Sequence, residues 1–258
     1  MTESANRLDD PFAQLTGSLA TASHWPLKVV SLRQLSPNVR RVELTAPELG
    51  TLEYQPGQDL MLLVGVEGNR PVRRRYTIRS LDRERHVAVI DVVMHGGGPG
   101  EDWIAAAKPG DTVQGIAPRG KIFPAQDVDW HLFVGDESAI PMVSAMIESL
   151  PATVAAVVVL EVPESADQQP IEGAGPVYTT WLPRDGQAPG DAKALVKAAS
   201  EVDLPTGRGH AYLCAEAKVV LALRDVLQTR GLEPQQISPK AYWGLGRSNA
   251  NHGEPAKD

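Results

Sequence analysis

The sequence contains a single cysteine, Cys214, among its 258 residues. One thiol cannot form an internal disulfide, and it cannot supply the several thiolates of a structural zinc or iron-sulfur site. The six histidines are scattered and show no metal-ligand spacing, so we predict no metal site. A chain with so little thiol chemistry suits a reducing compartment, and we therefore expect a cytoplasmic protein.

Long apolar runs and targeting signals are also lacking. No apolar stretch reaches the roughly 18 residues of a membrane-spanning helix, and polar residues 1–10 lack the basic and then apolar pattern of a secretory signal. The formal net charge is -7. Because surplus lysine and arginine hold phosphate backbones, this charge argues against a nucleic-acid partner. We expect no membrane insertion, no nucleic acid and a monomer.

Two glycine fingerprints of nucleotide sites are missing as well. The sequence has neither G-x-G-x-x-G nor G-x-x-x-x-G-K-[ST], so neither the Rossmann dinucleotide fingerprint nor a P-loop is present. A nicotinamide site in this chain is therefore inferred from fold analogy and not from a motif.

What the sequence does contain is two kinds of periodicity, one in each half. Short β-like runs separated by Pro, Gly, Asn and Asp indicate an antiparallel barrel in the first half. The expected strands cover residues 27–32, 39–46, 60–66, 75–80, 87–94 and 112–116, with a helix at 101–107. In the second half strands alternate with helices, and the continuous apolar run 154–162 indicates a largely parallel α/β sheet covered on both faces.

We therefore expect a two-domain β plus α/β protein. The predicted division is a tail at 1–25 with a helical turn near 12–19, a barrel domain at 26–126, an α/β domain at 127–248 and a tail at 249–258. The composition of residues 163–176 is typical of a flexible insertion. Ligands of α/β sheets bind beyond the carboxyl ends of the strands, where we expect Gly135-Asp136-Glu137-Ser138 and Ala215-Glu216.

One stretch, residues 70–79, combines arginines with a tyrosine and a threonine. Alternation along a strand places Arg74 and Tyr76 on one face and Thr77 on the other. Arginine binds phosphate through paired hydrogen bonds, a tyrosine ring packs on a flat heterocycle, and a hydroxyl reaches a ring nitrogen. A flavin nucleotide needs all three, although a basic surface strand has the same pattern.

A glycine loop, His95-Gly96-Gly97-Gly98-Pro99-Gly100, precedes the first expected helix. Such a loop lets backbone N-H groups approach a phosphate at the positive end of a helix dipole. The alternative is a tight turn that needs glycine for positive φ. His95 alone is more typical of a packing residue than of a ligand.

In order along the chain, several motifs together resemble one family. They are Arg74-Arg75-Tyr76-Thr77-Ile78-Arg79, Asp91 to His95 with Gly98-Pro99, Pro109-Gly110-Asp111, Pro118-Arg119-Gly120, Gly135-Asp136-Glu137-Ser138-Ala139-Ile140-Pro141 and Ala241-Tyr242-Trp243. Over residues 26–246 the chain resembles a siderophore-interacting protein, a flavin-dependent ferric-siderophore reductase of the ferredoxin reductase superfamily.

The resemblance implies an N-terminal FAD-binding barrel and a domain like those that bind nicotinamide nucleotides. The candidate FAD residues are Arg74, Tyr76 and Thr77 for the flavin side and Asp91, His95, Gly98, Pro99 and Gly100 for the rest of the dinucleotide. Ser138 is the candidate at a nicotinamide site. Electrons would come from NAD(P)H or reduced ferredoxin, and the acidic Glu137 and Glu216 favour NADH because they offer nothing to a 2′-phosphate.

The implied substrate is a ferric siderophore, reduced so that Fe(II) is released. We nominate no catalytic acid or base, because one electron suffices to loosen the complex. Arg119, Lys240 and Arg247 are candidate substrate contacts, since many ferric siderophores are anionic; otherwise each is a solvated surface charge. A general flavin reductase or electron-transfer component, and a siderophore-binding protein without turnover, are the alternative functions.

Three positions depart from the pattern of the family. Gly100 stands where alanine is common, Leu60-Met61-Leu62 fill a strand where many members carry a lysine for the substrate, and Ala117 replaces a glycine. These departures leave FAD binding intact, and they leave the identity of the siderophore open.

Overall fold

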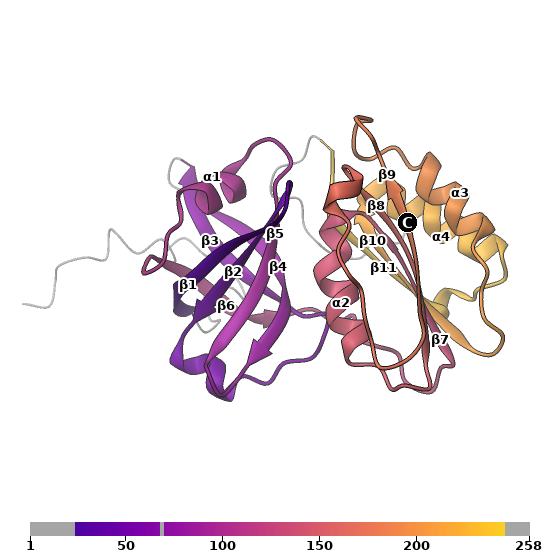
Figure 1. The fold of residues 1–258 in the computed structure, drawn as a ribbon, viewed down its shortest axis with the longest axis horizontal. Helices are drawn as coiled ribbons and strands as arrows, with labels where there is room; N and C mark the ends of the chain where they lie inside the picture. Colours follow the sequence, from indigo (N-terminus) through magenta and orange to yellow (C-terminus); the bar gives the residue numbers. More distant parts are fainter. Residues whose placement is uncertain (1–23, 68–69, 246–258) are drawn as a thin grey trace, which may run out of the picture.

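The computed structural model describes residues 24–67 and 70–245. A β-barrel and an α/β unit lie side by side (Figure 1). The helical turn expected near residues 12–19, the tail at 249–258 and Arg247 lie outside the described residues.

The first half is a closed antiparallel barrel with the strand order β1-β2-β5-β4-β3-β6. Its strands are β1 (His24–Ser36), β2 (Val39–Thr45), β3 (Asp59–Glu67), β4 (Arg70–Asp82), β5 (Val87–Val93) and β6 (Thr112–Arg119). Inward-facing aliphatic side chains such as Leu27, Leu60 and Ile90 are fully buried. The 3-10 helix η2 (Pro47–Thr51) and helix α1 (Pro99–Ala106) add Leu49 and Ile104 to this core.

The second half is a five-stranded parallel sheet with the order β11-β10-β7-β8-β9. Its elements are β7 (Trp130–Gly135), η3 (Glu137–Ala139), α2 (Ile140–Glu148), β8 (Ala155–Val162), η4 (Ser165–Asp167), β9 (Val177–Pro183), α3 (Lys193–Glu201), β10 (Gly209–Glu216), α4 (Ala217–Thr229), η5 (Pro234–Gln236) and β11 (Ile237–Trp243). Helix α2 covers the face toward the barrel, and α3 and α4 cover the other (Figure 1). The predicted two-domain β plus α/β fold is confirmed.

Strand order in this sheet reverses between β7 and β10. The chain runs from β7 to β8 and β9 on one side and returns to β10 and β11 on the other. The carboxyl ends at this switch point are Gly135 and Glu216. Open α/β sheets bind ligands outside the carboxyl ends at such a point, so this edge is one wall of any site.

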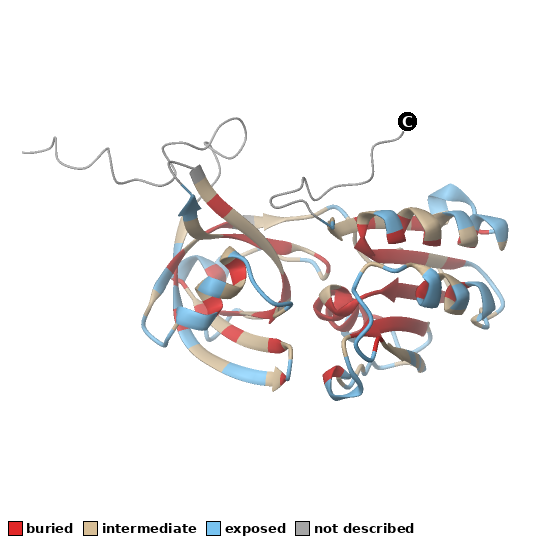
Figure 2. Ribbon diagram, turned by 90° about the horizontal axis from the view of Figure 1, so that it is seen from above, coloured by how far each residue is buried: buried red, intermediate tan, exposed pale blue. Residues whose placement is uncertain are grey.

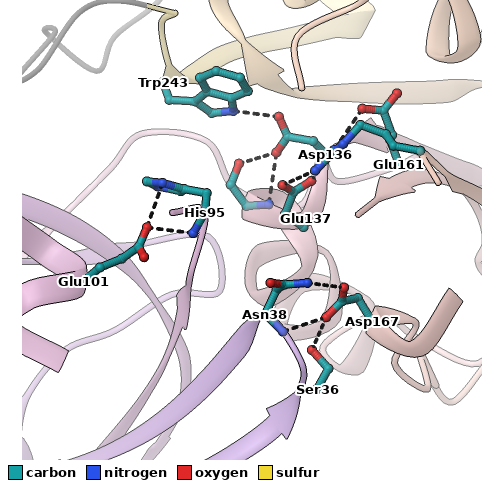
Figure 3. A network of polar contacts seen from close by, with 11 residues as sticks. Ser36, Asn38, His95, Glu101, Asp136, Glu137, Glu161, Asp167 and Trp243 are labelled. Atoms are coloured by element: carbon teal, nitrogen blue, oxygen red, sulfur yellow. Dashed lines mark hydrogen bonds and ion pairs between the residues drawn. The ribbon is translucent and has the colours of Figure 1, made fainter. Parts of the chain in front are cut away.

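Polar contacts fix the two halves to one another. Asp167 of η4 is fully buried and accepts hydrogen bonds from Ser36 Oγ (2.6 Å), Asn38 N (2.9 Å) and Asn38 Nδ2 (2.8 Å) in the barrel (Figure 3). On the other side of the interface, Arg79 of β4 pairs with Glu148 of α2. Residues 163–176, expected to be a flexible insertion, are therefore docked on the barrel through Asp167.

Each half also has its own core. Buried segments occupy the interior of the barrel and both sides of the sheet (Figure 2). The predicted boundary at residues 126 and 127 stays a prediction and falls in the connection between β6 and β7, whereas His24 and Trp25, assigned to the tail from sequence, begin β1. Within the described part of the chain, no helix has the length and apolar character to cross a membrane.

Candidate functional site

A pocket opens where strands β4 and β5 separate. Strand β4 pairs with β5 only between Ile78 and Asp82. Closer to its start it pairs with β3 alone, while residues 91–93 of β5 pair with β2. The resulting cavity has a volume of about 690 Å3, which lies in the range of small-molecule sites.

The pocket brings together residues that are far apart in the sequence. All nine candidate cofactor residues line it, from Arg74 in the barrel to Ser138 in the α/β half, and so does Lys240. Arg119 is half-buried at the end of β6 and is not a lining residue. Arg247 lies outside the described residues. The individual roles of these residues stay predictions.

One face of β4 turns toward helix α1. The ring of Tyr76 packs at 6.3 Å, centroid to centroid, from that of Trp103 on α1. A Cβ atom on Gly100 would lie 2.6 Å from the Tyr76 hydroxyl and 3.4 Å from Arg74 Cγ, so the absence of a side chain lets Tyr76 take this position against the helix. Burial raises the pKa of Tyr76, which keeps its hydroxyl protonated as a hydrogen-bond donor.

The opposite face of β4 turns toward the α/β half. Arg75 binds buried Asp59 through two hydrogen bonds of 2.6 Å, and Lys240 Nζ lies 3.3 Å from Asp59 Oδ2. Two cations and one carboxylate leave a net charge of +1 on this cluster. Lys240 is only 8% exposed, so it lines the pocket as part of an ion pair between the two halves and not as a free surface charge.

Next to this cluster lies a buried polar atom that has no hydrogen-bond partner among the described residues. The Tyr242 hydroxyl is buried and makes no hydrogen bond within the described part of the chain, although Thr77 and Cys214 are close enough to affect its pKa, which burial raises. Burial also raises the pKa of the Cys214 thiol to about 12, so it stays neutral. Because Tyr242 and Thr77 both line the pocket, the edge of a ring with nitrogen and oxygen atoms would satisfy them. The residues present thus fit a flavin.

The glycine loop already binds an anion, which is a side chain of the protein. Gly96, Gly97 and Gly98 all have positive φ. The Glu101 carboxylate accepts hydrogen bonds from His95 N (2.6 Å) and Gly96 N (3.2 Å) and pairs with His95 Nδ1 at 2.8 Å (Figure 3). The loop therefore has the geometry of an anion site, and a phosphate there would compete with Glu101.

Asp91, a second candidate near the loop, is held by an arginine. Arg41 donates from Nε and Nη2 to the two carboxylate oxygens of Asp91, at 2.7 and 2.8 Å. The pair joins β2 to β5 where the pocket begins. Asp91 thus shapes the wall, and any contact with a cofactor would use the remaining lone pairs of its oxygens.

The α/β wall is built around buried carboxylates at the ends of the strands (Figure 3). Asp136 accepts hydrogen bonds from Ser138 N (3.0 Å), from the Ser138 hydroxyl and from Trp243 Nε1 (2.7 Å). Burial, and secondly the nearby Glu137, raise the pKa of Asp136 to about 7. Arg184 binds Glu137 through two hydrogen bonds of 2.7 Å and Glu161 through one of 3.0 Å.

Sequence reasoning missed Asp59, Arg184 and Glu161. Glu161 offered a signal, because it is a lone charge inside the apolar run of β8 and a buried charge requires a partner. No local pattern identifies that partner as Arg184, since the two residues are joined only by the fold.

Comparison with known proteins assigns this architecture to a family. The sequence profile of the siderophore-interacting FAD-binding domain matches residues 64–122, and that of the siderophore-interacting protein matches residues 128–246. The ferric vibriobactin reductase ViuB of Vibrio cholerae is 30% identical over 253 residues, which cover 88% of this chain and 92% of that protein. The chain belongs to the siderophore-interacting protein family.

Other members of the siderophore-interacting protein family and its superfamily are similar in sequence and structure. The NADPH-dependent ferric-chelate reductase of Escherichia coli is 31% identical over 186 residues, covering 70% of each chain. A solved siderophore utilization protein from T. fusca has a TM-score of 0.81 at 29% identity and covers 89% of this chain and 96% of that one. The barrel followed by a parallel α/β sheet is the ferredoxin reductase-like fold.

Proposed function

We propose that this protein uses FAD to reduce ferric siderophore complexes, so that iron is released as Fe(II). The observation that carries the proposal is the pocket between the two halves, where the candidate FAD residues of the barrel face Lys240 and Tyr242 of β11. The match of residues 64–122 to an FAD-binding domain supports the cofactor. The names of the relatives from V. cholerae and E. coli support ferric reduction.

In the proposed complex, the barrel holds the cofactor. Arg74 would bind the pyrophosphate through its guanidinium, and Tyr76 would cover the flavin on the side of α1. The hydroxyls of Thr77 and Tyr242 would bind the polar edge of the ring. When bound, FAD supplies the conversion of a two-electron reduction into one-electron reductions of successive iron complexes.

The substrate would lie against the ion pair that joins the two halves. Hard oxygen ligands bind Fe(III) far more strongly than Fe(II), so a single electron loosens the complex and no acid or base is required from the protein. The cluster of Asp59, Arg75 and Lys240 carries a net charge of +1 and lies against the pocket, so it attracts an anionic siderophore. Arg119, whose backbone is in register with Asp59, is a second, weaker candidate.

An anaerobic titration tests this function without any assumption about the electron donor. The purified or FAD-reconstituted protein should show an oxidised flavin spectrum that dithionite bleaches. Adding a ferric siderophore should restore the spectrum at about two ferric complexes per FAD, with Fe(II) trapped by a chelator. Protein that takes up no FAD, or reduced protein that a ferric siderophore leaves reduced, contradicts the proposal. Binding of the siderophore without reoxidation would indicate the alternative of a binding protein.

A further inference from the structure

The carboxyl ends of β7 and β10 are covered by the protein's own C-terminal segment, residues 243–245. Trp243 Nε1 donates a 2.7 Å hydrogen bond to Asp136, which follows β7 (Figure 3). Leu245 N donates a 3.1 Å hydrogen bond to Glu216 at the end of β10. Because these two strands flank the switch point, this covering segment crosses the place where α/β sheets of this kind bind dinucleotides.

The backbone N-H groups at this place are occupied too. Asp136 accepts from Ser138 N at the start of η3. Glu216 accepts from Lys218 N (2.5 Å) and Val219 N (3.3 Å) at the start of α4. Such N-H groups are the usual donors to a diphosphate, and here buried carboxylates accept their hydrogen bonds in place of a diphosphate.

The remaining space is also limited. A Cβ atom on Gly190 would lie 3.4 Å from Trp243 Cη2 and 3.6 Å from Glu216 Cγ, so the loop after β9 packs against both residues. The open pocket is lined on this wall by Glu137, Ser138, Pro141 and Pro189 and by residues 243–245 themselves. Trp243 thus offers a surface for a ring beside the barrel, while two hydrogen bonds hold residues 243–245 across the ends of β7 and β10.

We propose that a nicotinamide donor is recognised by its dihydropyridine end alone, and that its diphosphate and adenosine make no specific contact with this protein. This rests on the proposed function. A hydride leaves C4 of the dihydropyridine with both electrons of the C-H bond and reduces FAD, and the donor becomes a nicotinamide cation. The sequence favoured NADH because Glu137 and Glu216 are acidic. Glu137 is bound to Arg184, and Glu216 is bound to the start of α4 and to Leu245, so neither carboxylate selects between NADH and NADPH.

Direct binding of the adenylate half tests the inference without turnover. ADP-ribose and 2′-phospho-ADP-ribose contain the diphosphate and adenosine but no nicotinamide. Calorimetric titration into the FAD-loaded protein should give no saturable heat up to about 10 mM. Saturable binding of either compound with a Kd below about 1 mM would overturn the proposal, since millimolar affinity already corresponds to about 4 kcal/mol of binding free energy.

A variant tests whether the covering segment closes the switch point. Trp243→Phe keeps an aromatic ring and removes the N-H that binds Asp136. This change should produce saturable ADP-ribose binding within the 10 mM range, while Tyr178→Phe, an exposed aromatic on β9, should leave binding undetectable. No saturable ADP-ribose binding by folded, FAD-loaded Trp243→Phe would overturn the role of residues 243–245.

Donor truncation provides a kinetic readout. Stopped-flow reduction by NADH, NADPH and reduced nicotinamide mononucleotide should give second-order rate constants within about fivefold of one another, because remote binding energy contributes nothing to the reaction. A mononucleotide at least a hundredfold slower than NADH or NADPH, or no reduction by any of the three, contradicts the inference. Ferric reduction itself is judged separately, from the reoxidation of dithionite-reduced protein.

Discussion

At the scale of single residues, charged side chains around the pocket are held in ion pairs before any ligand arrives. Asp59 is bound by Arg75 and Lys240, and Asp91 by Arg41. Leaving any of these carboxylates buried without a partner would cost several kcal/mol. The types of residue at the site follow from the sequence, but these pairings do not, since Asp59 and Lys240 are 181 positions apart.

Arg74 should be required for the cofactor. It lines the pocket two residues before Tyr76, where a pyrophosphate needs a cationic donor. Losing a charge-assisted and bidentate contact costs on the order of 1.5 to 3 kcal/mol, so Arg74→Ala should weaken FAD binding by about ten- to a hundredfold. Flavin content after purification and fluorescence titration with FAD measure this. Arg33→Ala, an exposed arginine on β1, is the control, and equal affinity in the two variants would refute the assignment.

His131 should make the fold sensitive to acid. It is almost fully buried beside Phe133 and Tyr212, and burial, with a smaller effect of His210, lowers its pKa from 6.5 to about 4. Between these pH values the unfolded chain binds more protons than the folded one, so stability falls as the pH drops through this window.

The measurement is the free energy of unfolding from pH 7.5 down to pH 4. His131→Phe should remove about 2 to 3 kcal/mol of the acid-induced loss, at roughly 1.4 kcal/mol per unit of pKa shift. At pH 7.5 the charge of His131 should contribute nothing to the free energy of unfolding, because the side chain is neutral in both the folded and the unfolded state. Parallel pH profiles for the variant and the unaltered protein would show that other groups cause the loss.

At the scale of elements, sequence periodicity located the six strands of the barrel but not their full lengths. Strand β4 begins at Arg70 and not near residue 75, because residues 70–74 lack the apolar alternation of a core strand. Residues 163–176 have the composition of a mobile loop, yet Asp167 fixes them through partners 129 and 131 positions away. A local pattern carries no information about such contacts.

Asp167 should hold the η4 segment on the barrel. Asp167→Ala leaves Ser36 Oγ and two donors of Asn38 without their acceptor, at a cost of about 1 to 3 kcal/mol. Hydrogen exchange should accelerate in residues 163–176 and in the turn between β1 and β2, while β7 and β8 stay protected. Ser165→Ala, an exposed change on the same turn, should leave exchange as it was. Uniform acceleration throughout the chain would instead indicate global destabilisation.

At the scale of the whole molecule, the site exists only because both halves contribute a wall. The barrel supplies the fork between β4 and β5, and the sheet supplies β11 and the start of α2. The resemblance to a reductase family indicated the two domains and most of the residues on the barrel wall. It did not indicate that Asp136 and Glu216 bind residues 243–245. These contacts depend on how β10 pairs with β7 and β11, which brings the ends of the three strands together.

The charge of the cluster between the halves should select among siderophores. Lys240→Met keeps an unbranched side chain that is one atom shorter, and it changes the net charge of the cluster from +1 to zero. It should weaken an anionic ferric catecholate by about tenfold, roughly 1.4 kcal/mol, and leave a neutral ferric hydroxamate within about twofold. Because Lys240 is mostly buried, about 0.5 M salt should reduce this difference less than for an exposed charge.

Two controls separate charge from structure in this experiment. Lys193→Met removes a fully exposed lysine on α3, and it should affect neither complex. Arg119→Ala, at a half-buried position that does not line the pocket, should have a smaller effect than Lys240→Met. Titration of both ferric complexes into each FAD-loaded variant gives the comparison. Equal losses of the catecholate and the hydroxamate in Lys240→Met would mean that Lys240 only joins the two halves, and that the anionic substrate is attracted elsewhere.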